Sequence, residues 1–264
     1  MTDHQSKFVD PILNTFVNND IKEFAVELLN TLPDYVWHVG ASSTGKYHPE
    51  YSLGDGGLMR HQVAVVRFLN FFFELEQYNK GFTDREMDLM RVAGLIHDGR
   101  KSGEQSDYEK SKYTKFDHPV RMAEVVKAAN GLTQAERDFI AHCIESHMGQ
   151  WNVDKKTKFE LNKPNDDYQK LVHLADYLAS RKDLTMAFDN YEVNSNEANA
   201  KAIENFDIDN YVLPFGKHKG VKLIDVYKNT PDYVAWMKSE IQRKDVQDAI
   251  AALEKKISEE EDDL

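Results

Sequence analysis

The sequence predicts a mainly α-helical fold with a small α+β module at its C-terminal end. Three observations support this prediction. Helix-start signals recur along the chain, apolar residues follow them at helical spacing, and no convincing alternating strand pattern occurs before residue 205. The 264 residues are 41% apolar and 11% aromatic, which is enough to bury the core of one large domain or of one medium and one small domain.

The first long helix is expected over residues 58–78. Thr83 and Glu86 have the spacing of a capping box, in which the Thr hydroxyl and the Glu carboxylate satisfy free backbone N–H groups. A second helix is therefore expected to begin at Thr83 and to run through the apolar segment Val92–Ile96.

Three more helices follow from their end signals. Pro119 suits the first turn of a helix that Gly131 would close. Thr133 and Glu136 form another capping-box pair, and Asn165 can cap a helix whose apolar residues continue to residue 178.

The C-terminal part differs in composition. Residues 192–202 are polar and lack large apolar side chains, which indicates a boundary. Residues 211–220 predict a short strand and a glycine-punctuated turn, and two short helices are expected at Leu223–Tyr227 and Pro231–Ile241. The predicted organisation is a domain at 1–190, a linker at 191–206, an accessory module at 207–255 and an acidic tail at 256–264, which we expect to be solvated and disordered.

Composition excludes several classes of protein. A formal net charge of −12 argues against broad coating of nucleic acid, although it leaves room for a local basic groove. The single cysteine, Cys143, excludes an intrachain disulfide, and the first residues contain no apolar signal core. The richest apolar run, residues 63–73, is far shorter than the ~20 residues that cross a bilayer. A cytoplasmic protein without a membrane partner is therefore expected.

The chemistry-bearing residues are histidines and aspartates near expected helix ends. His97-Asp98 ends one apolar helical run, His61 lies in the first turn of another helix, and His118 precedes Pro119. Imidazole nitrogen and carboxylate oxygen bind divalent metals, and a carboxylate can bridge two of them. The sequence therefore predicts one or two divalent ions, of which Mn, Fe, Ni, Co, Zn and Mg all suit these ligands, held by residues drawn from His61, His97, Asp98, His118, His142, His147 and Asp176.

Two of these histidines compete for one role. His142 and His147 are five positions apart, which is about 140° around a helix at ~3.6 residues per turn, so both cannot easily face one ion. Taken singly, each histidine is more often a surface residue or a hydrogen-bonded core residue than a ligand.

The order of these residues resembles that of the HD superfamily of metal-dependent phosphohydrolases, an all-helical fold named for its His-Asp doublet. The segment His-Asp-Gly-Arg-Lys at 97–101 is close to the family's His-Asp-Ile-Gly-Lys. The resemblance is most specific to the HD domain of bacterial 3′-to-5′ exoribonucleases and covers roughly residues 40–185. Residues 56–61, 144–149 and 173–176 are similar to its Gly-Gly-Leu-Leu-Glu-His, Ile-Leu-Ser-His-His-Gly and His-Leu-Ala-Asp segments.

This resemblance implies an HD-domain helical bundle and a set of ligands. The first metal would be held by His61, His97, Asp98 and Asp176. Asp98 would bridge to a second metal bound by His118 and His147. Met148 departs from the pattern, because two-metal members have a second histidine there and a thioether is a poor ligand for a hard cation. The second site would then be weaker, recruit His142, or fill only with substrate present.

The resemblance also implies roles in catalysis. Asp98 would act with the metal that lowers the pKa of a bound water, and Lys101 would neutralise a non-bridging phosphate oxygen. The alternative for Lys101 is an ordinary surface lysine. His48 is a candidate for substrate contact or a plain loop histidine. His173, one turn before Asp176, suits a packed group or one that supports a ligand.

The accessory module carries a second resemblance. Residues 214–220 and 232–236 are similar to a small module at the C-terminus of some exodeoxyribonucleases. Lys217 and Lys219, with Lys222, concentrate positive charge, which suits contact with substrate phosphate. The alternative is a solvated hairpin over a core of Phe215, Tyr233 and Trp236.

We therefore expect a metal-dependent phosphohydrolase or phosphodiesterase that acts on a nucleotide or on single-stranded nucleic acid. The sequence does not decide between polymer and small nucleotide, or between RNA and DNA. Two other classes stay open. One is a di-iron oxygenase of a small molecule, and the other is a non-catalytic nucleotide-binding protein that keeps its metal for structure.

Overall fold

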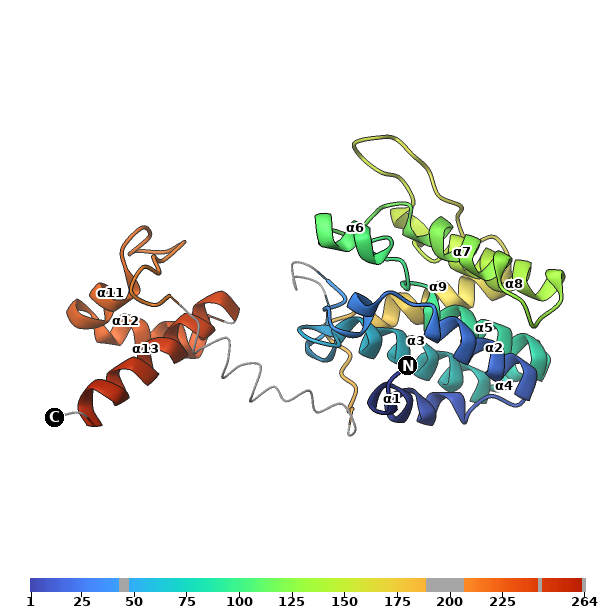
Figure 1. Ribbon diagram of the computed structural model, residues 1–264, viewed down its shortest axis with the longest axis horizontal. Helices are drawn as coiled ribbons and strands as arrows, with labels where there is room; N and C mark the ends of the chain where they lie inside the picture. The colour runs from blue at the N-terminus through green and yellow to red at the C-terminus, as the bar shows by residue number, and fades with distance from the viewer. Residues whose placement is uncertain (43–47, 189–206, 242–243, 263–264) are drawn as a thin grey trace. The chain divides into compact units, whose positions relative to one another are not determined.

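The computed structural model describes residues 1–42, 48–188, 207–241 and 244–262. These residues are mainly helical, which confirms the predicted fold class (Figure 1). The chain forms two compact units, Met1–Tyr191 and Glu192–Leu264. Within the described ranges the only β-structure is two isolated antiparallel bridges, Val153 with Glu160 and Val212 with Lys222. The strand predicted near residue 211 is thus a single bridge, and an α+β module is not confirmed.

Helices α3, α5, α7, α8 and α9 form the part of the first unit that carries the predicted site residues. α5 packs against α2, α3, α8 and α9, and α7 packs along α8. The first unit contains, in order, α1 (Asp3–Leu13), α2 (Asn19–Asn30), η1 (Asp34–Trp37), η2 (Glu50–Ser52), α3 (Gly57–Glu74), α4 (Glu76–Asn79), α5 (Asp84–Ile96), α6 (Gln105–Lys110), α7 (His118–Ala128), α8 (Gln134–Glu145), η3 (Gly149–Trp151) and α9 (Asp167–Ala179).

Local capping chemistry sets the starts of two central helices. The Thr83 hydroxyl accepts a hydrogen bond from the Glu86 N–H at the start of α5. The Thr133 hydroxyl does the same for the Glu136 N–H at the start of α8. In both cases the Glu carboxylate accepts a bond from the Thr N–H, so both predicted capping boxes are confirmed.

Three predicted helix boundaries are wrong. The cap of α9 is Asp166 rather than Asn165, because the Asp166 carboxylate accepts from the Gln169 N–H while Gln169 bonds back. α7 ends at Ala128, and Gly131, with φ of +107°, belongs to the turn that follows. The predicted helix over residues 58–78 breaks at Leu75, whose backbone is extended. The break lets Leu75 and the Tyr78 ring, in the following helix α4, pack against the core.

α5 is buried along most of its length, since every residue from Met87 to Ile96 is buried. Its charged residue Asp88 is fully enclosed and accepts hydrogen bonds from the Val17 and Asn18 N–H groups, which tie the α1–α2 connection to α5. Helices α1, α2 and α6 were not predicted. The His97-Asp98 doublet therefore sits at the end of a central helix that other helices enclose.

The second unit has a core of its own. Its described residues form the helices α11 (Leu223–Asn229), α12 (Pro231–Glu240) and α13 (Lys244–Asp262). Buried Val246, Ala249 and Leu253 recur at helical spacing in α13 and join that core. The expectation of an irregular tail at 256–264 is wrong as far as Asp262, because α13 continues to that residue.

The predicted core of the module needs one correction. Phe215 and Tyr233 are partly buried and pack against the core of the second unit. Trp236 is 46% exposed, because α12 directs its neighbours Val234 and Met237 inward instead. The predicted linker, residues 191–206, lies outside the described residues. Among the described helices, none is both long and apolar enough to cross a membrane.

Candidate metal centre

Five helices bring their ends, and with them the predicted ligands, to one place. His61 lies in the first turn of α3, His97 caps the end of α5 with Asp98 next to it, and His118 is the first residue of α7. His147 follows the end of α8, and Asp176 lies in the last turn of α9. Apart from His97, all of these residues line one pocket of about 600 Å³.

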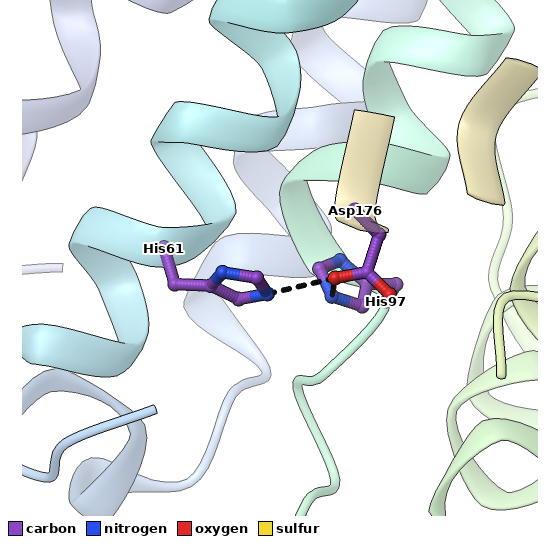
Figure 2. Close-up of side chains that lie close together, drawn as sticks. All are labelled: His61, His97 and Asp176. Atoms are coloured by element: carbon purple, nitrogen blue, oxygen red, sulfur yellow. Dashed lines mark ion pairs between the residues drawn. The ribbon is translucent and has the colours of Figure 1, made fainter. Parts of the chain in front are cut away.

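Two imidazoles converge on the carboxylate of Asp176. His61 Nε2 lies 3.0 Å from Asp176 Oδ1, and His97 Nε2 lies 3.6 Å from the same oxygen. Figure 2 shows both rings pointing at that oxygen from different helices. Residues from α3, α5 and α9 thus form one group of mutually close nitrogen and oxygen atoms.

Asp98 is the centre of a second group. Its Oδ1 lies 3.0 Å from His118 Nε2 and 3.8 Å from His147 Nε2. Its Oδ2 lies 3.7 Å from His97 Nε2 and accepts a hydrogen bond from the Lys101 ammonium. The two oxygens of one buried carboxylate therefore face different nitrogen donors, which is the arrangement that a bridging ligand needs.

The backbone sets the tautomer of three of these histidines. His97, His118 and His147 each place Nδ1 2.6–2.8 Å from a backbone carbonyl oxygen three residues earlier in the chain. A carbonyl only accepts hydrogen bonds, so each Nδ1 carries the proton and each Nε2 presents a lone pair. This is how metal-binding histidines are commonly oriented.

The distances fit a divalent ion among these atoms. Nitrogen ligands lie about 2.0–2.1 Å from zinc, so two neighbouring ligand atoms of one tetrahedral or octahedral ion lie roughly 2.8–3.4 Å apart. His118 Nε2 and His147 Nε2 are 3.3 Å apart, a separation at which two lone pairs repel unless a cation or a proton lies with them. In addition, His97 Nε2 is buried and has no hydrogen-bond partner among the described residues.

The surrounding charges keep both carboxylates ionised. Burial by itself would raise the pKa of Asp98, but Lys101, His97 and His118 outweigh it and hold that pKa well below the ordinary value. Burial opposes the same shift at Asp176, where the neighbouring His61 and His97 outweigh it and also hold the pKa well below the ordinary value. The centre thus presents two negative charges to an ion at neutral pH.

The pKa values of the buried histidines shift in opposite directions. Burial, together with the neighbouring His97 and His118, lowers the pKa of His147 to about 3. Burial, helped by His61 and Lys101, lowers the pKa of His48 to about 4. At His97 burial is outweighed by the charge of Asp98 and by the nearby Asp176 carboxylate, so the pKa is raised. His147 and His48 are therefore neutral at pH 7, as a ligand and a hydrogen-bonding group require.

The structure does not bring His142 to the centre. α8 ends at Glu145, and the chain then turns, so His147 points inward while His142 stays on the exposed face of the helix. The expected angular conflict was calculated for one continuous helix, which does not exist here. Met148 lines the pocket beside His147. His173 donates from Nδ1 to the His147 carbonyl oxygen at 2.7 Å and so supports the segment that carries this ligand.

Two of the predicted substrate-contacting residues lie in the same pocket, and two lie in the second unit. Lys101 and His48 line the pocket, and the buried His48 Nδ1 has no hydrogen-bond partner among the described residues. Lys217 and Lys219 are exposed in the second unit, without an ion pair in the part of the chain that the structure describes.

Several lining residues were not predicted from the sequence. Trp151, Tyr177 and Arg181 line the same pocket as the metal-ligand candidates. The position of Tyr177 directly after Asp176 was the available signal for one of them. Nothing in the spacing of Trp151 or Arg181 indicated their approach.

Comparison with known families gives a match to the HD domain. Residues 58–181 match the model of the HD domain, a span that includes all six ligand candidates from His61 to Asp176. The match supports membership of the HD superfamily, whose domains are in general metal-dependent hydrolases. Comparisons with curated proteins and with solved structures give no match.

Proposed function

Given an HD domain at residues 58–181, we propose that this protein is a metal-dependent phosphohydrolase that cleaves a phosphoester of a nucleotide or of single-stranded nucleic acid. One observation carries the proposal. His97, His118 and His147 donate from Nδ1 to the backbone, and their Nε2 atoms converge on the ionised carboxylate of Asp98. Lone pairs and a negative charge gathered in this way are suited to hold a cation.

A bound divalent ion would supply a water of lowered pKa and positive charge for the phosphoryl oxygens. His61, His97, Asp98 and Asp176 would hold a first ion, and Asp98 with His118 and His147 would hold a second. The assignment of residues to each ion and the number of ions bound are both part of this proposal. Two close groups of donor atoms support two ion positions: His61 with His97 and Asp176, and His97 with Asp98 and His147. His118 joins the second position through its 3.0 Å approach to Asp98 Oδ1.

The remaining pocket residues suit a phosphate. The Lys101 ammonium is on the pocket wall beside Asp98, so it can neutralise a non-bridging oxygen of the substrate. His48 is neutral at pH 7 and keeps Nδ1 without a partner among the described residues, so it can exchange a hydrogen bond with the substrate. These two residues bind and orient the phosphate next to the metal ligands.

Charge supports a nucleotide or nucleic-acid substrate. The protein is strongly acidic, yet the pocket contains the cationic residues Lys101 and Arg181. In the second unit, exposed Lys217 and Lys219 supply further positive charge for the phosphates of a longer strand. The resemblance to exoribonuclease HD domains, noted from the sequence, also favours a polymer.

The test is hydrolysis by protein stripped of metal and then loaded with one divalent metal at a time. Substrates are a chromogenic phosphodiester, a chromogenic phosphomonoester and a single-stranded oligonucleotide. His97→Ala is expected to abolish metal binding and turnover. His142→Ala is the matched control, because it removes an exposed histidine from the adjacent α8, and it is expected to change neither.

Turnover of none of these substrates with any divalent metal would contradict the proposal. Oxygen-dependent turnover of a small molecule with iron alone would replace it by the oxygenase alternative. Equal metal content in His97→Ala and the wild-type protein would remove His97 from the site.

A further inference from the structure

The rim of the pocket carries a stack of two aromatic rings and a guanidinium group. The rings of Trp151 and Tyr177 are nearly parallel, with an interplanar angle of 20° and a centroid separation of 5.9 Å. The Arg181 guanidinium carbon lies 5.3 Å from the centre of the Tyr177 ring. Trp151 comes from η3 and the other two residues from α9 and its end, so the stack joins two segments that also carry metal-ligand candidates.

About half of the Trp151 side chain is open to solvent. It is 52% exposed, whereas Trp37, in the core of the same unit, is 4% exposed. A large aromatic ring that is half exposed at the edge of a pocket leaves apolar area available for a ligand. Because Tyr177 supports the indole from within the protein, the ring is held in place while part of its surface stays free.

The backbone holds Trp151 firmly relative to the metal ligands. Gly149 has φ of +54°, and a Cβ atom there would lie 2.1 Å from Cε1 of His173. The turn after His147 is therefore pressed onto the His173 ring, which also donates to the His147 carbonyl oxygen. The position of the indole is thus coupled to the position of a ligand only four residues away.

The chemistry of the rim selects the kind of group that binds there. A flat aromatic group stacks on an indole face, and every nucleobase has such a face. The Arg181 guanidinium at the same rim has no ion pair among the described residues, so its charge is available to a phosphate attached to that group. The pocket volume of about 600 Å³ is in the range of small-molecule sites.

We propose that Trp151, supported by Tyr177, is the stacking platform for the nucleobase next to the phosphate that is cleaved. This inference rests on the proposed function and narrows it, because it requires a substrate whose phosphate is attached to a base-bearing sugar. Trp151 is then the specificity-determining residue of the pocket, and sugar phosphates without a base are poor ligands.

The test compares two probes that cannot be hydrolysed, the phosphonate analogues of adenosine 5′-monophosphate and of ribose 5-phosphate. Their affinities for metal-loaded full-length protein are measured by calorimetry. Base–aromatic stacking of about 1–3 kcal/mol corresponds to a roughly five- to 150-fold weaker binding of the adenosine probe by Trp151→Ala. The ribose probe is expected to bind with unchanged affinity, and Trp151→Phe is expected to retain most of the affinity for the adenosine probe.

Trp236→Ala is the matched control, since Trp236 is also half exposed and also packs on a tyrosine, Tyr233, but lies in the second unit. It is expected to change the affinity for neither probe. If Trp151→Ala does not fold, quenching of wild-type tryptophan emission by the adenosine probe, and its absence in Trp151→Phe, provides the same test.

The inference is overturned if Trp151→Ala weakens both probes equally, weakens neither, or if the adenosine probe leaves the emission of Trp151 unchanged. These outcomes are independent of turnover. A protein that hydrolyses no phosphoester but discriminates the two probes through Trp151 would contradict the proposed function and leave the platform standing as a nucleotide-binding site.

Discussion

Replacing Asp98 with asparagine is expected to separate the contribution of this carboxylate to metal binding from its contribution to stability. The Asp98 side chain is 3% exposed and pairs with Lys101, which is 15% exposed, and with His118 at 3.0 Å. Removing one member of a buried charge pair typically costs about 3–5 kcal/mol. We expect the lower end, about 3 kcal/mol in the free energy of unfolding of the metal-free protein, because the amide keeps the shape and one acceptor oxygen. A domain with about 5–15 kcal/mol of stability stays folded.

The loss in stability should also depend on pH with a definite sign. The pKa of Asp98 is lowered in the folded protein, so its contribution is present above the ordinary aspartate value of 3.8 and is lost as the pH falls through the lower folded value. Urea unfolding of wild-type and variant protein is therefore expected to differ by a constant amount near neutrality. The difference should shrink in strong acid.

A second buried carboxylate provides the control. Asp88 is fully buried, pairs with Arg91 at 2.7 Å and lies within α5, away from the pocket. Asp88→Asn is expected to lower the free energy of unfolding by a similar amount and to leave metal content unchanged. Asp98→Asn is expected to lower the free energy of unfolding and also to lose the bound metal. Full metal occupancy in Asp98→Asn, or the same loss of metal in both variants, would refute the assignment of Asp98 as a ligand.

Four further results are expected. Met148→His should tighten binding of a second metal, because Met148 lines the pocket and a nitrogen ligand would replace a thioether; an unchanged metal titration would argue for one ion. Truncation after residue 206 should leave hydrolysis of a small phosphodiester nearly intact. It should weaken oligonucleotide cleavage in a salt-dependent way, because it removes Lys217 and Lys219. Equal oligonucleotide cleavage by the full-length and truncated forms would exclude the second unit from substrate binding. Metal affinity should fall in mild acid. At His97 the effect of burial is outweighed by Asp98 and the pKa is raised, so the ion must displace a proton. Calorimetry in buffers of different ionisation enthalpy measures the release of that proton. Without metal, the same raised pKa stabilises the fold below the ordinary histidine value of 6.5, and this contribution should be lost at higher pH.

The sequence predicted structure best where a short-range interaction determines it. The capping boxes at Thr83 and Thr133 need only a glutamate three residues later in the chain, so their helices began where expected. The break at Leu75 depends on packing against the core and was missed, and α13 was missed as well. A regular apolar spacing at Val246, Ala249 and Leu253 was present in the sequence and would have predicted α13.

The site shows the same division. The predicted ligands from His61 to Asp176 lie near helix ends, and those ends meet in the fold. His142 was kept as an alternative because Met148 stands where a second histidine was expected, and the sequence does not show that α8 ends at Glu145. Trp151 reaches the pocket through a tight turn at Gly149, whose positive φ is a property of the backbone that no motif revealed.

The enclosed position of α5 has a consequence for hydrogen exchange. Amide protons in a helix buried from Met87 to Ile96 can exchange with solvent mainly when the whole unit opens, whereas those of exposed turns exchange by local opening. A metal bound at His97 and Asp98 would stabilise the folded state as a whole through linkage. Its binding should therefore slow deuterium uptake along all of α5, including at Met87, which lies in the first turn of the helix, far along the chain from the ligands.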